Sequence, residues 1–148
     1  MVTEWFSINW DSDSQPSQLF ESVRRHFAGV TFVADSPRTL NEVIAGKFLE
    51  GGWAQTFKLP GSNMSVSFLR ERTAACVQLG NVARVFADLL KLQNLFDRKL
   101  IDHAILLVPS DALSKQFGAN HASFGRVVRD LETLALSLSC PILVMSVS

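Results

Sequence analysis

Three small polar side chains, those of Ser67, Cys76 and Gln78, could form one reactive cluster. Ser67 lies in the apolar segment 64–69, and the other two lie in the segment 73–79. Two such segments separated by a few charged residues predict a β-hairpin. Because side chains alternate between the faces of a strand, Cys76 and Gln78 share one face, and pairing would bring Ser67 beside them. Small residues also make room for a packed helix, and residue types alone favour that structural role.

A nucleophile and a histidine base would be one use of such a cluster. Ser65, Ser67 and Cys76 have the right types for the nucleophile. His103 has the right type for the base, but no nucleophile-elbow or cysteine-protease pattern surrounds these residues. The three histidines share no metal-ligand spacing, and no glycine-rich phosphate loop is present. Cys76 and Cys140 both lie in apolar segments, so we expect reduced, buried thiols rather than one disulfide.

The hairpin belongs to a chain of alternating helix and strand patterns. Strands are expected at 2–10, 30–33, 51–60, 64–69, 73–79, 100–108 and 140–147, and helices at 14–28, 39–51, 82–96, 111–117 and 124–138. The strand–helix–strand–helix–strand order of the second half predicts parallel pairing there. We therefore expect a single α/β domain over residues 1–148, with a central mixed β-sheet and helices on both of its faces.

Two of the expected helices carry charged residues with a local explanation. Thr39 is a plausible N-cap, and Glu42 three residues later completes a capping box. In the helix at 82–96, the apolar stripe marks the core face, and Arg84, Asp88 and Lys91 mark the opposite face. Arg84 and Asp88 stand four residues apart, so we expect them to form an exposed ion pair.

The stretch 64–93, with its hairpin, the sequence VQLGN at 77–81 and a following helix, resembles the core of the BglII-type enzymes in the restriction-endonuclease-like superfamily. The segment 37–53 resembles the helix and Gly-Trp that precede this core, and 100–114 and 139–147 resemble later strands. The likeness covers roughly residues 30–147. It implies a restriction-endonuclease-like three-layer sandwich, double-stranded DNA as a partner, a homodimer and Mg²⁺-dependent DNA cleavage.

The acidic positions of that family pattern are not acidic in this chain. By this resemblance, the metal-binding acid of the first strand corresponds to Ser67, with Ser65 at the second acidic site. The acid of the Glu-x-Gln pair corresponds to Cys76, and only Gln78 remains. Hydroxyl and thiol groups are poor substitutes for two carboxylates around a hard dication. The departures predict a degenerate nuclease site, no metal cofactor and no hydrolysis, which leaves DNA binding or protein interaction as the function.

Acids elsewhere define the alternative function. Glu42 on the upstream helix and Glu71 in the hairpin turn are candidates for migrated metal ligands, which would make the chain an active Mg²⁺-dependent endonuclease. Arg38, Arg70 and Arg72 are candidates for contacts with DNA phosphates, although an exposed surface role accounts for each of them equally well.

Composition limits these functions further. The chain has 148 residues, with 14 basic and 14 acidic side chains, so its formal net charge is zero. A general electrostatic attraction to nucleic acid or to an anionic membrane is therefore not expected, and any DNA contact needs a local patch. Neutrality modestly favours a third interpretation, a structural or regulatory subunit with no affinity for DNA. No apolar run reaches the length of a membrane-spanning helix, and no basic leader precedes the first segment, so we expect a soluble cytoplasmic protein.

Overall fold

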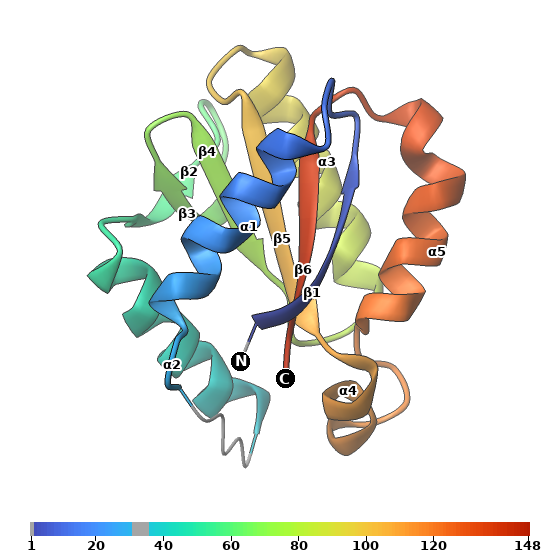
Figure 1. Cartoon of the computed structure of the whole chain (residues 1–148). Helices are drawn as coiled ribbons and strands as arrows, with labels where there is room; N and C mark the ends of the chain where they lie inside the picture. Colours follow the sequence, from blue (N-terminus) through green and yellow to red (C-terminus); the bar gives the residue numbers. More distant parts are fainter. Residues whose placement is uncertain (1, 31–35) are drawn as a thin grey trace.

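The computed structural model describes residues 2–30 and 36–148, and a six-stranded mixed sheet runs through its centre (Figure 1). The strands are β1 (Val2–Ile8), β2 (Ala54–Lys58), β3 (Ser65–Arg70), β4 (Thr73–Val77), β5 (His103–Pro109) and β6 (Ile142–Val147). Their order is β1-β6-β5-β4-β3-β2. β4, β5 and β6 are parallel to one another, whereas β1, β3 and β2 add antiparallel neighbours at the two sides. The predicted hairpin and the parallel pairing of the second half are both confirmed.

Helices cover both faces of this sheet. They are α1 (Ser14–His26), α2 (Pro37–Glu50), α3 (Ala83–Asp97), α4 (Asp111–Phe117) and α5 (Phe124–Leu134), with a 3₁₀ turn at Ala135–Ser137. Leu92 of α3 and Leu131 of α5 join one buried cluster on one face of the sheet. Val23 of α1 and Phe48 of α2 join a second cluster on the other face. These two cores confirm the expected three-layer sandwich.

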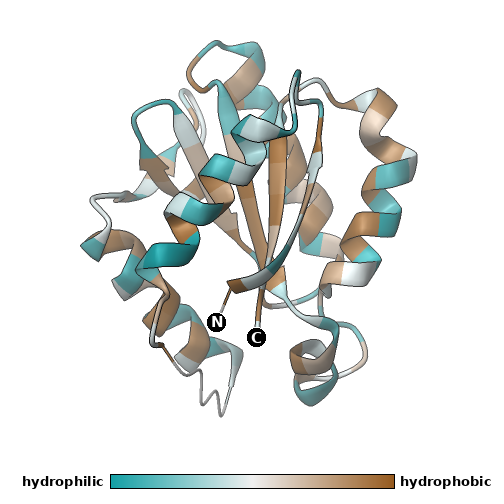
Figure 2. Cartoon of the chain, in the orientation of Figure 1, coloured by the Kyte–Doolittle hydropathy of each residue, from teal (hydrophilic) through white to brown (hydrophobic). Residues whose placement is uncertain are grey.

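The parallel strands form the most deeply buried part of the molecule. Every residue of β6 is buried, and so is every residue of β5 after His103. Strands covered on both faces need apolar side chains on both, which explains their continuous apolar runs. Figure 2 shows these strands as the most hydrophobic part of the ribbon, with hydrophilic residues along the outer helix surfaces. Each fully buried leucine contributes about 2 kcal/mol through its burial.

Several expected boundaries differ from the structure. The strand predicted at 30–33 lies almost entirely outside the described residues. α2 begins earlier than expected, because Ser36 is its N-cap and accepts a hydrogen bond from the backbone N–H of Thr39. The capping box of Thr39 and Glu42 is therefore wrong, and Pro37 takes the first helical position, where a missing N–H costs nothing. α5 ends at Leu134 rather than near residue 138, and a 3₁₀ turn follows it.

None of the described helices is long and apolar enough to cross a membrane.

Candidate functional site

The β3–β4 hairpin opens at the end away from its turn. Its ladder pairs Arg70 with Thr73, Leu69 with Ala74, and Phe68 with Ala75. At the next residue, Ser67, the hydroxyl oxygen accepts the backbone N–H of Val77 at 3.1 Å, so a side chain takes the place of a main-chain acceptor.

The neighbouring strand bends at the same level. β2 pairs Gln55 with Phe68 and Phe57 with Val66, and Thr56 lies between these pairs with a φ of 58°. A positive φ is unusual for a β-branched residue and costs roughly 1–2 kcal/mol. Alternation along β3 breaks here as well, because Val66 and Phe68 belong to the cores on opposite faces of the sheet. The bend and the open hairpin together create space at this end of the strands.

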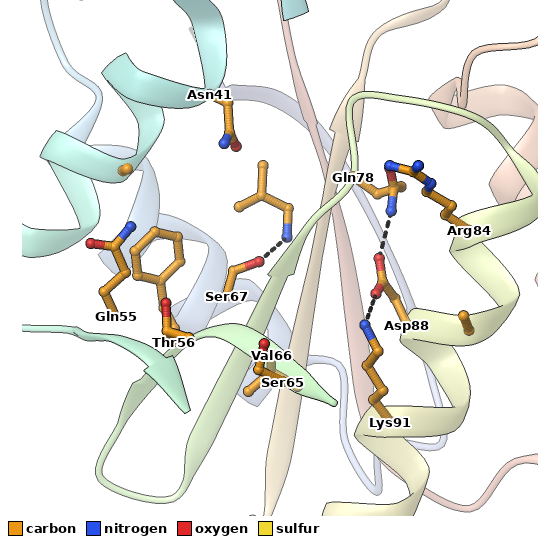
Figure 3. A pocket seen from close by; sticks show the side chains of 14 residues that line it. Asn41, Gln55, Thr56, Ser65, Val66, Ser67, Gln78, Arg84, Asp88 and Lys91 are labelled. Carbon is orange, nitrogen blue, oxygen red and sulfur yellow. Dashed lines mark hydrogen bonds and ion pairs between the residues drawn. The ribbon is translucent and has the colours of Figure 1, made fainter. Parts of the chain in front are cut away.

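That space is a pocket of about 500 Å³ between α2, α3 and the ends of β2, β3 and β4. Figure 3 shows Ser67 near its middle, Asn41 reaching in from α2, and a chain of polar contacts on the α3 side. Its polar and charged lining consists of Asn41, Gln55, Thr56, Ser65, Ser67, Gln78, Arg84, Asp88 and Lys91. With two cations and one carboxylate, the titratable part of this lining carries a formal charge of +1.

The only carboxylate in this lining, Asp88, is buried and fully engaged. Its residue is 6% exposed. The Gln78 side-chain amide donates to Asp88 Oδ2 at 2.9 Å, and Lys91 Nζ lies 3.1 Å from Oδ1. The Gln78 carbonyl oxygen in turn accepts the backbone N–H of Gly80 at 3.2 Å. A buried carboxylate needs such partners, so this network fixes the Gln78 and Lys91 side chains at the wall of the pocket.

Of the hairpin residues predicted to share a site, the structure brings together Ser65, Ser67 and Gln78. Cys76 is not part of the lining: it is 1% exposed and packs in the core against α3. Burial raises the pKa of its thiol to about 12, and the negative charge of Asp88 adds to this shift. Cys76 and Cys140 are both free and buried, as expected.

The two candidate migrated acids lie elsewhere. Glu42 is exposed on α2 and pairs with Arg38 at 3.3 Å, and its neighbour Asn41 is the residue that faces the pocket. Glu71 lies in the hairpin turn, four residues beyond Ser67 along the strand, a span of roughly 13 Å. Neither glutamate lines the pocket.

The candidate DNA-binding arginines are also outside the pocket lining. Arg70 donates to the carbonyl oxygen of Gly51 at 3.0 Å and stacks over the Trp53 ring. Arg72 forms two hydrogen bonds with the Asp102 carboxylate, at 2.8 and 3.0 Å. The arginine lowers the pKa of Asp102 mainly through these hydrogen bonds.

His103 lies too far along the sheet to serve as a base for Ser65 or Ser67. It pairs with Thr73 beside the hairpin turn, and its ring stacks on Trp10 at 4.5 Å.

Asp88, Lys91 and Arg84 are the site residues that the sequence pattern placed on the solvent face. Asp88 is buried instead, because it follows Val85 by three residues and so lies on the flank of the core stripe. Its ion pair is with Lys91 rather than with Arg84. Phe86, expected in the buried stripe, is 41% exposed. The three-residue spacing between Val85 and Asp88 indicates that they share a helix face. The charge of Asp88 favoured the opposite, exposed face in the sequence pattern.

Comparison with known proteins identifies the family. A model described as restriction endonuclease BglII/BglIII matches residues 15–147 of this chain. The chain belongs to the BglII/BglIII restriction endonuclease family.

The fold of this BglII-family chain is also that of solved relatives. It matches the crystal structure of BglII complexed with a DNA 16-mer, with a TM-score of 0.82 and 13% identity over 98% of this chain and 77% of that one. It matches free BglII with a TM-score of 0.71 and 14% identity over 98% of this chain and 78% of that one. No curated protein matches the chain. The likeness predicted from the hairpin is therefore confirmed for the family and the fold.

Proposed function

We propose that this BglII-family protein binds double-stranded DNA without hydrolysing it. The observation that carries the proposal is the state of Asp88, the single carboxylate in the pocket where Ser67 and Gln78 meet, which already holds a lysine and an amide.

This donor set does not fit the divalent cation that the family implies. Mg²⁺ prefers carboxylate oxygens, and the other oxygen donors in the pocket are hydroxyls and amides. Lys91 Nζ places a permanent positive charge beside the one carboxylate, and a dication would have to displace it against charge repulsion. We therefore derive no metal-dependent step for this chain.

The same lining suits an anion. Arg84 and Lys91 give the pocket a formal charge of +1, and the hydroxyls of Ser65 and Ser67 can donate to phosphate oxygens. BglII itself has been crystallised with a DNA 16-mer. A duplex backbone held by such cations would bind with strong salt dependence.

Two measurements test the proposal. Purified protein incubated with plasmid DNA and Mg²⁺ or Mn²⁺ is expected to leave the plasmid supercoiled. The same protein is expected to retard a duplex at low salt, and the Arg84→Gln variant, which changes an exposed cation of the pocket, is expected to retard it less. Metal-dependent cleavage that disappears on Gln78→Ala or Glu42→Ala would overturn the loss of hydrolysis. Absence of duplex binding at low salt would overturn the DNA partner and leave a protein-interaction subunit.

A restoration experiment sharpens the first measurement. Ser65→Asp with Ser67→Asp returns acids to the two family positions that line the pocket, and Asp88→Asn in the same background removes the carboxylate that holds Lys91. Gain of Mg²⁺ binding by this triple variant, measured by calorimetry, would support replacement of the acids as the cause of inactivity. If wild-type protein binds Mg²⁺ equally well, the proposed cause is wrong.

A homodimer is part of the same proposal. Phe86 and Leu90 of α3 are 41% and 67% exposed, and with Leu134 and Leu138 they line an apolar pocket of about 200 Å³. A second copy would cover these side chains. Light scattering is expected to give the mass of a dimer for the wild type and of a monomer for Leu90→Asp. A monomeric wild type would overturn this part.

The same proposal places the protein in the cytoplasm, where buried cysteines remain reduced.

The active alternative has less support. It relied on Glu42 and Glu71 as migrated ligands, and one of these is paired with Arg38 outside the pocket while the other lies in the hairpin turn.

A further inference from the structure

A second pocket, of about 490 Å³, lies between α4 and the beginning of α5. Its charged lining consists of Lys115 from α4, Arg126 and Arg129 from α5, and Asp111. The formal charge of this lining is +2, twice that of the first pocket, in a chain whose net charge is zero. Positive charge is therefore concentrated here.

The three cations of this pocket have no competing partners. Lys115, Arg126 and Arg129 are exposed, and none of them forms an ion pair or a hydrogen bond with another described residue. This differs from Arg24, Arg38, Arg70 and Arg72, which are all bonded to carboxylates or carbonyls. Unpaired cations around one concavity are available to a ligand.

Unlike the cations, the one carboxylate in the lining of this pocket, Asp111, is held by a hydrogen bond. Asp111 Oδ1 accepts the backbone N–H of Gly125 at 2.8 Å, in the first turn of α5. A Cβ at position 125 would clash with this carboxylate, so the glycine allows the close approach. Asp111 thus connects α4 to α5 and fixes the relative position of the two helices that carry the cations.

Neutral polar groups complete the lining. Ser123 is the N-cap of α5, but its side chain makes no capping hydrogen bond, so its hydroxyl can donate to a ligand. His121 also lines the pocket, and its Nδ1 is buried without a hydrogen-bond partner among the described residues. An unsatisfied buried nitrogen is unfavourable, and a ligand group that forms a hydrogen bond with it would remove this cost.

The position of the pocket in the fold also favours ligand binding. α4 and the beginning of α5 lie at the end of the sheet where β5 and β6 finish (Figure 1). Ligands of open α/β sheets bind beyond the carboxyl ends of the strands. The loop before α5 is bonded to the segment that follows Gln78, through Ala122 N–H to the Gly80 carbonyl at 2.8 Å and Val82 N–H to the Asn120 carbonyl at 2.9 Å. The two pockets therefore lie at the same end of the sheet, on either side of these two bonded segments.

We propose that the pocket formed by Lys115, Arg126, Arg129 and Ser123 is a phosphate-binding site, separate from the pocket at Gln78. Its ligand is a tetrahedral phosphate group, either of a nucleic acid backbone or of free phosphate. The site uses none of the residues of the family pocket, so it does not depend on whether that pocket hydrolyses DNA.

The test is a nuclear magnetic resonance titration of ¹⁵N-labelled full-length protein at constant ionic strength. The probes are inorganic phosphate in one arm and a short DNA duplex in the other, with chloride as the reference anion. Saturable shifts of the Gly118, His121 and Gly125 amides are expected, and Arg126→Gln with Arg129→Gln should abolish them. The charge-matched control is Arg24→Gln with Arg25→Gln on α1, which should leave them unchanged.

Affinity for the duplex gives a second measurement. If the backbone is the ligand, the α5 variant should lose at least about tenfold in affinity, and its salt slope should fall by about two, one for each lost phosphate contact. Shifts with inorganic phosphate but not with the duplex would support the site and assign free phosphate as its ligand. No saturable shift with either probe, or equal losses in the α5 and α1 variants, would overturn it. Plasmid cleavage would contradict the proposed function without affecting this outcome.

Discussion

The two ends of the β3–β4 hairpin carry different kinds of residue and use them differently. At the turn, Arg70 and Arg72 are charged, and both are held by neighbouring backbone or carboxylate groups. At the open end, Ser67 and Gln78 are neutral, and both line a pocket. The charged end stabilises the fold through these contacts, whereas the uncharged end lines the pocket between α2 and α3. Within the hairpin, charge is therefore a poor guide to which end lines the pocket.

The difference arises from what each end must satisfy. A tight two-residue turn brings its side chains back onto the sheet, and Arg72 reaches both Asp102 and the Lys99 carbonyl there. Where the strands separate, backbone groups lose their ladder partners and need side chains, which is why Ser67 binds the N–H of Val77. Substitutions at both ends test whether the two sets of residues differ in this way.

Cys76→Glu should have the largest effect. A carboxylate at this 1% exposed position would be buried beside Asp88, and an uncompensated buried charge costs about 3–5 kcal/mol. Burial raises the pKa of such a carboxyl, so the loss should be smaller at pH 4.5 than at pH 7.5. Urea unfolding at the two pH values measures it, with Cys76→Ala as the control. An equal loss at both values would mean that packing rather than charge is responsible.

Lys91→Met should have the next largest effect. Removal of the ammonium leaves the buried Asp88 carboxylate with only its Gln78 amide, at a cost of about 1–3 kcal/mol. Asp88→Asn in the same chain should recover part of this loss, because no charge then remains unpaired. Urea unfolding of the two single variants and the double variant gives the coupling energy. Additive losses would contradict a direct Asp88–Lys91 interaction.

Ser67→Ala should cost about 1 kcal/mol, because the N–H of Val77 loses its acceptor. Ser65→Ala is the matched control, since no hydrogen bond of its side chain is found within the described residues and its loss should change little. The unfolding midpoints of the two variants in urea make the comparison. Equal midpoints would mean that water replaces the Ser67 hydroxyl at no cost.

Arg72→Ala should have the smallest effect on stability. The Arg72–Asp102 pair is about half exposed on both sides, so solvent screens it. Arg72 lowers the pKa of Asp102, so the contribution of the pair is present above the carboxyl pKa of the unfolded chain and is lost as the pH falls through the lower pKa of the folded state. Wild-type and variant unfolding curves should therefore converge in acid. A difference that grows in acid would contradict this assignment.

Much of the fold could be predicted because burial dictates its pattern. The apolar runs of β5 and β6 and the stripe of α3 mark elements covered by other layers, and the structure places them as expected. The sequence pattern does not locate the beginning of α2, because Ser36 and Thr39 are both good N-caps. Only the backbone geometry decides between them.

The site was less predictable, because it depends on where strands separate rather than on which residues they contain. Ser67 and Gln78 were found through their strand positions and the family likeness. The hydrogen bond that satisfies the buried Asp88 depends on the open hairpin, which lets Gln78 reach across to α3. The bend at Thr56 has no sequence signature, since threonine is ordinarily a good strand residue with a negative φ.

That bend has a counterpart on the opposite side of the sheet. The β2–β3 ladder lacks a pair at Thr56, which has a positive φ, and the register of β1 against β6 shifts between Val2 and Trp5. These are the two outermost strands, the only ones with unpaired backbone edges among those described. Irregular edges are poor templates for strand addition, so copies of this protein are protected against edge-to-edge aggregation into extended sheets. Any ordered self-association is thereby directed to the helical surfaces.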